Sequence, residues 1–168
     1  NRNFRNEGVS TRHNPEFTML EFYQAYATYE DLMDLTEEML VQVAEQVTGG
    51  LALTYGDLSI DLTPPWPRRS MAELVAERAG VTVEQILEPE RLRDLARSTG
   101  GIERASMTPG DLLGVLFERL VEPHLVQPTF VCQFPVEMSP LARRDDADPR
   151  FVDRFELYLA RHEIANAF

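Results

Sequence analysis

The residues best suited to bind a ligand lie near the start of the chain. Arg5 and Glu7 share one side of an extended run, and the run from Phe17 to Tyr23 alternates with the period of a half-buried strand. A hairpin joined by residues 8–16 would place these side chains on one surface: Arg5, Glu7, Phe17, Glu21 and Tyr23. A guanidinium there suits a phosphate, because its planar donors match two oxygens at once, and an aromatic ring can stack on a base. Such a surface could bind a nucleotide; the alternative, which the pattern alone favours, is an amphipathic hairpin with solvated charges.

Three blocks of the sequence together resemble the class II aminoacyl-tRNA synthetases, in the form used by lysyl-tRNA synthetase. The first block, from Arg5 to Glu21, resembles the second signature motif of that class. The blocks at residues 126–143 and 154–168 follow in the family's order and at family-like distances. Residues 66–107 carry little of the family's pattern, so the resemblance covers most of the chain but not all of it.

The resemblance implies a role for each matching residue. Arg5, as the catalytic residue, would bind the α-phosphate of ATP and the amino-acid carboxylate, Glu7 would accept from the adenine amino group, and Phe17 would stack on the purine. The full ATP-binding set would be Arg5, Glu7, Arg12, His13, Asn14 and Phe17, and the lysine pocket would contain Glu21, Tyr23 and Asn166.

Glu156 and Glu163 match the family's magnesium-binding carboxylates. On one straight strand they would point to opposite faces, because their separation is odd. A two-residue turn at Ala160-Arg161 would make them diagonal neighbours on one face, roughly 7–8 Å apart at the backbone, where they could share Mg²⁺. The alternative is two solvated glutamates on an exposed hairpin. The turn lacks the glycines that the family has there, so we expect it to be longer or bulged. Asn166 would point to the same face as Glu163 only if a bulge lies between them.

The composition is that of one globular domain. The chain has 168 residues, of which 43% are hydrophobic and 26% are charged, and this length is sufficient for a sizeable core. The net charge is −12 and every basic residue is arginine, so this segment is not expected to hold tRNA by itself. No apolar run approaches the length of a membrane span and the start resembles no signal peptide, which predicts a cytoplasmic protein without a membrane partner. A single cysteine and three scattered histidines offer no transition-metal site.

Local signals predict a mixture of helices and strands. Capping residues predict helices over about 28–47 and 70–79, from 82 onward, and over 108–121. Alternating runs predict strands within 51–62, 128–137 and 151–159, while Trp66 is expected in a loop packed on the core. We expect an α+β domain with a largely antiparallel sheet flanked by helices, which resembles an incomplete class II synthetase catalytic core over residues 1–168. Residues 66–107 would form a small helical insertion within it.

The activity implied by the resemblance is ATP-dependent activation of lysine and its transfer to tRNA(Lys), with Mg²⁺ as cofactor. The partners would be ATP, lysine, tRNA(Lys) bound through regions outside this segment, and a second copy in a homodimer. In the family, a glutamate that recognises lysine and a second arginine that binds ATP come after the segment that matches Asn166-Ala167-Phe168. Neither has a counterpart in this sequence. We therefore expect these residues to be the middle of a catalytic domain and to be inactive alone. The alternatives are a paralogue that lysylates a protein, a non-catalytic interaction module of the same fold, and an unrelated acidic domain.

Overall fold

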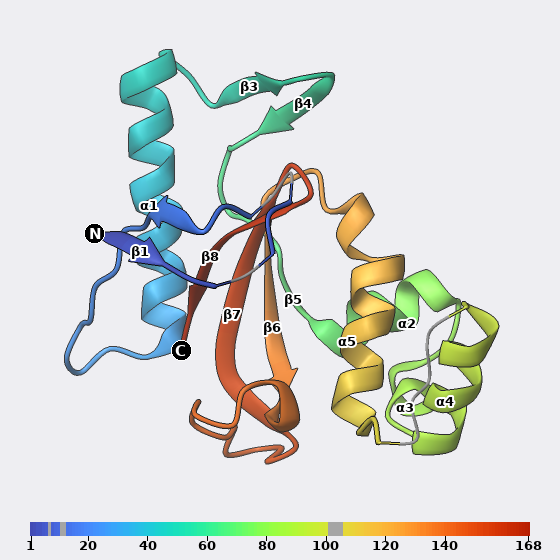
Figure 1. Ribbon diagram of the computed structural model, residues 1–168. Helices are drawn as coiled ribbons and strands as arrows, with labels where there is room; N and C mark the ends of the chain where they lie inside the picture. Colours follow the sequence, from blue (N-terminus) through green and yellow to red (C-terminus); the bar gives the residue numbers. More distant parts are fainter. Residues whose placement is uncertain (7, 11–12, 101–105) are drawn as a thin grey trace.

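The central element of the fold is a four-stranded sheet. The computed structural model describes residues 1–6, 8–10, 13–100 and 106–168 (Figure 1). The sheet has the order β5 (Arg68–Ser70), β6 (Thr129–Pro135), β7 (Phe151–Leu159) and β8 (His162–Ala167). β5 runs parallel to β6, and the other two pairs are antiparallel. This arrangement agrees with the predicted α+β fold and its largely antiparallel sheet.

Helices cover both faces of this sheet (Figure 1). One long helix lies on one face and four shorter helices lie toward the other: α1 (Tyr29–Thr48), α2 (Met71–Ala79), α3 (Val83–Ile86), α4 (Pro89–Ser98) and α5 (Pro109–Leu120). Two 3-10 turns, Glu122–His124 and Val136–Met138, follow α5 and β6. The predicted helix starts are confirmed, because Thr28, Ser70, Thr82 and Thr108 each form a capping box.

The alternation of β7 divides the core into two clusters. Val152 and Tyr158 pack with α2, α3, α4 and α5, whereas Phe155 and Leu157 pack with α1 on the other face. Along β7, Arg154 and Glu156 point to the same face of the sheet as Val152 and Tyr158. Two charged side chains therefore lie in the middle of the face that α5 covers. The fold therefore places a polar cluster around Arg154 and Glu156 on an otherwise packed face of the sheet.

The second cluster confirms the prediction for Trp66 and also contains the single cysteine, Cys132. Trp66 is buried in a loop, with its ring centroid 5.9 Å from that of Phe130, and its Nε1 donates to the carbonyl of Leu62. Cys132 is a buried strand residue whose Sγ lies 3.6 Å from Met33 Sδ. Burial raises the pKa of the Cys132 thiol to about 12, which keeps it protonated.

Two smaller hairpins complete the described structure. β3 (Ala52–Tyr55) and β4 (Leu58–Asp61) form the predicted pair of short strands. β1 (Arg2–Phe4) pairs with β2 (Glu16–Thr18) as a separate two-stranded sheet. The strand predicted over Phe17 to Tyr23 is therefore wrong in extent. Asn1 already pairs with Met19 through two hydrogen bonds, so β2 has no further partner on β1.

Within residues 66–107, the described residues form β5 and the helices α2, α3 and α4. β5 belongs to the main sheet, and α2 and α4 pack on α5. Their status as an insertion relative to the family stays a prediction. No described helix combines the length and the apolar character that crossing a membrane requires.

Candidate nucleotide and metal site

The β1–β2 hairpin places Arg5 beside Phe17. Asn3 is the direct partner of Phe17, and the backbone N of Arg5 donates to the carbonyl of Pro15 at 2.9 Å, which extends the ladder past Phe4. Arg5 and Phe17 are consequently diagonal neighbours on one face. The Arg5 Cζ lies 5.6 Å from the centroid of the Phe17 ring, and Arg5 is exposed while Phe17 is half-buried. A guanidinium and an aromatic ring thus share one solvent-facing surface, as predicted.

The loop of this hairpin is folded around Ser10 and His13. The Ser10 Oγ accepts from the backbone N of His13 at 3.1 Å and lies 3.0 Å from its Nδ1, while the Ser10 backbone N donates to the His13 carbonyl. His13 and Asn14 are both exposed next to the hairpin. Glu7 and Arg12, the other two predicted ATP-binding residues, lie outside the described residues.

Glu21 and Tyr23 do not reach the Arg5 surface through strand alternation. Both lie after the end of β2 in a segment without regular structure, where Tyr23 is 93% exposed and its hydroxyl lies 3.5 Å from Glu21 Oε1. The prediction of one continuous strand surface that carries both residues is therefore wrong. The reason is the early end of β2, because alternation relates residues only within one strand.

The β7–β8 hairpin turns at the predicted residues. Leu159 pairs with His162, and Ala160 and Arg161 have φ values of 53° and 67°. The expected longer turn is wrong, since this is a tight two-residue turn with both residues in the left-handed region. Two tertiary hydrogen bonds hold it: Ala160 N donates to Val126 O at 2.9 Å, and Arg161 N donates to Leu125 O at 2.8 Å. The surrounding chain thereby stabilises a backbone that side chains normally disfavour.

A bulge in β8 brings three predicted residues onto one face. Tyr158 pairs with Glu163 and Leu157 with Ala165, so Ile164 is the extra residue and Glu156 pairs with Asn166. Without that extra residue, Glu163 and Asn166 would point to opposite faces. The bulge that Asn166 required is confirmed, and Glu156, Glu163 and Asn166 lie together on the side of the sheet that carries Tyr158.

The electrostatics of this face are dominated by carboxylates. Glu156 is only 8% exposed, its Oε1 accepts from Arg154, and its Oε2 accepts from the Tyr158 hydroxyl at 2.7 Å. Burial raises the pKa of Glu156, while the hydrogen bond from Tyr158 and the charge of Arg154 oppose that rise. Glu163 keeps exposed atoms, but partial desolvation, followed by the negative charge of Glu156, raises its pKa to about 7. The two neighbouring carboxylates, Glu156 and Glu163, thus share one positive charge, that of Arg154, which is bound to Glu156.

Comparison with known proteins identifies the family of the chain. A family model described as tRNA synthetases class II (D, K and N) matches residues 1–168, which is the whole chain. The chain belongs to this family.

Individual synthetases resemble the chain over nearly its full length. The lysine–tRNA ligases of Bacillus thuringiensis and Bacillus anthracis are each 48% identical to it over 165 residues, and that of Moorella thermoacetica is 50% identical over 165 residues. These matches cover 98% of this chain but 33% or 34% of the relatives. The chain spans about a third of the length of the curated relatives it matches.

The carboxylate face of this synthetase chain fits a hard divalent cation. Mg²⁺ is commonly bound through one or two carboxylates together with waters and substrate phosphates, and Glu156 and Glu163 supply two carboxylates on one face. Desolvation, and after it the negative charge of Glu156, raises the pKa of Glu163, and a bound cation would oppose both effects. Among the residues that the structure describes, no group of three or more His, Cys, Asp or Glu side chains could hold a metal ion. Two carboxylates on one face suit a cation that is shared with substrate phosphates.

The raised pKa of Glu163 predicts a pH-dependent stability in the absence of divalent cations. Its proton is bound more tightly in the folded state, so its stabilising contribution is full below the ordinary pKa of 4.5 and is lost as pH rises to about 7. Because Glu163 is partly exposed, we expect the loss to reach at most about 1 kcal/mol. Glu163→Gln removes the titration. The difference in thermal midpoint between the full-length wild type and this variant, measured with a chelator, should change across that pH window. A difference that stays constant with pH would contradict the assignment.

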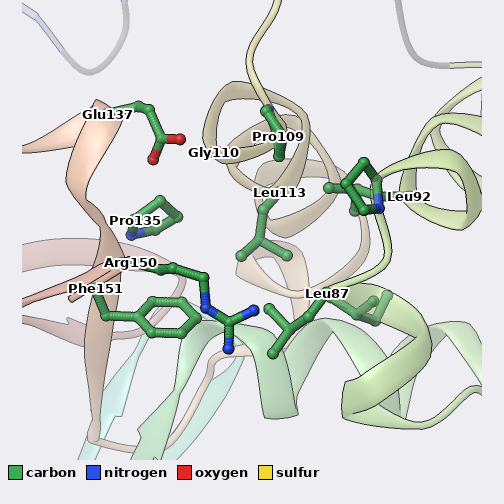
Figure 2. Close-up of a pocket in the computed structure, with 11 residues that line it drawn as sticks. Leu87, Leu92, Pro109, Gly110, Leu113, Pro135, Glu137, Arg150 and Phe151 are labelled. Carbon is green, nitrogen blue, oxygen red and sulfur yellow. The ribbon is translucent and has the colours of Figure 1, made fainter. Parts of the chain in front are cut away.

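A separate cavity of about 360 Å³ lies away from these residues (Figure 2). Its lining is largely apolar and comes from α3, α4, α5, the end of β6 with the 3-10 turn after it, and the start of β7. Glu137 points toward Gly110 at the start of α5, where an added Cβ would lie 2.8 Å from the Glu137 Oε2 (Figure 2). Arg150 is bound to Asp148 through hydrogen bonds of 2.6–3.1 Å. None of the residues predicted to bind ATP, lysine or magnesium lines this cavity.

Sequence reasoning missed the residues that hold the carboxylate face in place. Arg154 and Tyr158 both bind Glu156, and Ser139 accepts from Arg154. The alternation of β7 was a signal that could have grouped Arg154, Glu156 and Tyr158 on one face before the structure was known.

Proposed function

We propose that the protein containing this chain is a lysine–tRNA ligase, which activates lysine with ATP to lysyl-adenylate and transfers it to tRNA(Lys). The observation that carries the proposal is 48–50% identity, over 98% of the chain, to proteins named lysine–tRNA ligase. The shared face of Arg5 and Phe17 and the carboxylate face of β7 and β8 support it, because activation requires a base platform and groups that bind phosphate and metal.

The β1–β2 hairpin supplies the ATP platform in this proposal. Phe17 stacks on the purine, and Arg5 binds the α-phosphate and the lysine carboxylate. Glu7 accepts from the adenine amino group, and the remaining ATP contacts come from Arg12, His13 and Asn14. A purine on Phe17 would share the ring with the Arg5 guanidinium, which already lies 5.6 Å from the ring centroid.

The first reaction step needs alignment more than proton transfer. The lysine carboxylate attacks the α-phosphorus and pyrophosphate leaves, and a carboxylate is already ionised at neutral pH. The protein therefore contributes orientation and stabilisation of charge in the transition state, which is the task of Arg5. Mg²⁺, when bound by Glu156 and Glu163, would neutralise negative charge on the phosphates. Glu21, Tyr23 and Asn166 contribute to the lysine pocket.

The other proposed partners interact outside this segment. With a net charge of −12, the chain disfavours a phosphate backbone, so tRNA(Lys) is held by other parts of the full-length protein. A homodimer and a cytoplasmic location are further parts of this proposal, in line with the resemblance noted from the sequence.

Amino-acid specificity tests the proposed function directly. The full-length protein is incubated with ATP, labelled pyrophosphate and each standard amino acid in turn, and exchange is measured. We expect exchange with lysine and not with aspartate or asparagine, the other two amino acids named for the family. The protein should also charge tRNA(Lys). Exchange that depends on aspartate or asparagine would overturn the assignment, and lysine activation that labels a protein but not tRNA would favour the protein-modifying paralogue.

A further inference from the structure

Arg154 lies at the centre of the polar cluster on β7 and β8. Its side chain is 14% exposed, and its Cζ lies 4.5 Å from the centroid of the Phe134 ring. Its Nη1 donates to Ser139 Oγ, its Nη2 donates to Glu156 Oε1, and its Nε donates to Asn166 Oδ1 at 3.1 Å. One planar group thus connects β6, the segment after it, β7 and β8.

The contact with Arg154 fixes the orientation of the Asn166 amide. A guanidinium has donors only, so the Asn166 oxygen must face Arg154. The amide NH₂ group therefore points away from Arg154 and can donate to a different partner. Since Asn166 is exposed on this face, an acceptor such as the carboxylate of a bound amino acid matches its free donors.

The same guanidinium and Tyr158 fix the carboxylate of Glu156. Each carboxylate oxygen receives one hydrogen bond, from Arg154 on Oε1 and from Tyr158 on Oε2. A carboxylate has about four lone-pair sites, so each oxygen keeps one for a further partner. A carboxylate held in one orientation, with a lone pair left on each oxygen, is suited to bind a divalent cation.

We propose that Arg154 is a positioning residue, which holds Glu156 ready for magnesium and turns the Asn166 amide toward the amino acid. The inference rests on the proposed lysine–tRNA ligase function. Arg154 itself acts through these two residues and is shielded by Phe134, Ser139 and the strand partners.

The substitution Arg154→Lys separates positioning from charge. Lysine keeps the positive charge, but a single ammonium cannot reproduce the planar fork that reaches three acceptors at once. In full-length protein bound to a non-hydrolysable ATP analogue, we expect the Kd for Mn²⁺, measured by electron paramagnetic resonance, to rise by about 10- to 100-fold, the range seen when outer partners of metal ligands are removed. The Mg²⁺ concentration for half-maximal ATP–pyrophosphate exchange should rise with it. The KM for lysine should rise as well, because Asn166 loses its fixed orientation, while the KM for ATP should change less.

The matched control is Arg150→Lys, four positions earlier, where an exposed arginine binds Asp148 outside the cluster. It should leave the Mg²⁺ dependence, both KM values and the thermal midpoint unchanged. A wild type without lysine-dependent exchange would refute the proposed function itself. An active wild type with unaltered Mg²⁺ dependence and lysine KM in Arg154→Lys would overturn the positioning role.

A second variant guards against misfolding. If Arg154→Lys lowers the thermal midpoint, Ser139→Ala removes one acceptor of Arg154 without touching the charge. We expect smaller shifts in the same direction for the Mg²⁺ requirement and the lysine KM. Wild-type values of both in Ser139→Ala would then count against the proposal.

Discussion

Arg5→Ala in the full-length protein should lower kcat/KM for lysine-dependent ATP–pyrophosphate exchange by roughly 100- to 1000-fold. This is the range found when one fixed donor to a developing oxyanion is removed. The Arg5 side chain is exposed, and its Cζ lies 5.6 Å from the centroid of the half-buried Phe17 ring, where a nucleotide could reach both residues. Steady-state exchange rates at several ATP concentrations would give the size of the effect.

Arg2→Ala is the matched control for this substitution. Arg2 lies on the same strand with opposite parity, is exposed, and forms a surface ion pair with Glu16 at 3.6 Å. Such pairs contribute little to stability, so the control should keep near-wild-type exchange. Near-full activity of Arg5→Ala, or an equal loss in both variants, would remove Arg5 from the reaction.

Glu163→Gln should also lower exchange strongly, by about 10- to 100-fold at low Mg²⁺, with partial recovery at high Mg²⁺. The variant removes one of two carboxylates proposed to bind the cation but keeps the size of the side chain. Glu163 is the better position to change, because Glu156 is buried and bound to both Arg154 and Tyr158, so its loss would also disturb the fold. A titration of exchange rate against Mg²⁺ measures the effect.

The control for this variant is Glu38→Gln on the exposed side of α1. It makes the same chemical change far from the carboxylate face and should leave the Mg²⁺ titration unaltered. If Glu163→Gln required no more Mg²⁺ than the wild type, Glu163 would not be a metal ligand.

Local signals in the sequence predicted most of the secondary structure. Capping boxes at Thr28, Ser70 and Thr108 depend on residues three positions apart, so the sequence alone contains the whole interaction. The strand at residues 151–159 was predicted with its observed bounds, because it is rich in strand-favouring Phe, Val and Tyr and follows the charged stretch 143–150. In contrast, the predicted strand beyond Thr18 failed, since its existence depended on a partner strand rather than on its own pattern.

The geometry of the site was predictable where it follows from the alternation of side chains along a strand. It was not predictable where it follows from tertiary contacts. Parity required a bulge before Asn166, and the bulge is present at Ile164. The tight turn at Ala160 and Arg161 was not foreseeable, because carbonyl groups of Leu125 and Val126 hold it. The alternation of β7 could have grouped Arg154 with Glu156, but its contacts with Ser139 and Asn166 join separate segments that meet only in the folded chain.

The most direct measurement is a crystal structure of the full-length protein with lysine, a non-hydrolysable ATP analogue and Mn²⁺, whose anomalous scattering locates the cation. We expect the adenine against Phe17, the α-phosphate on Arg5, and Mn²⁺ bound by Glu156 and Glu163. An analogue bound elsewhere, for example in the cavity between α3, α4 and α5, with both glutamates free of metal, would contradict the assignment of the site.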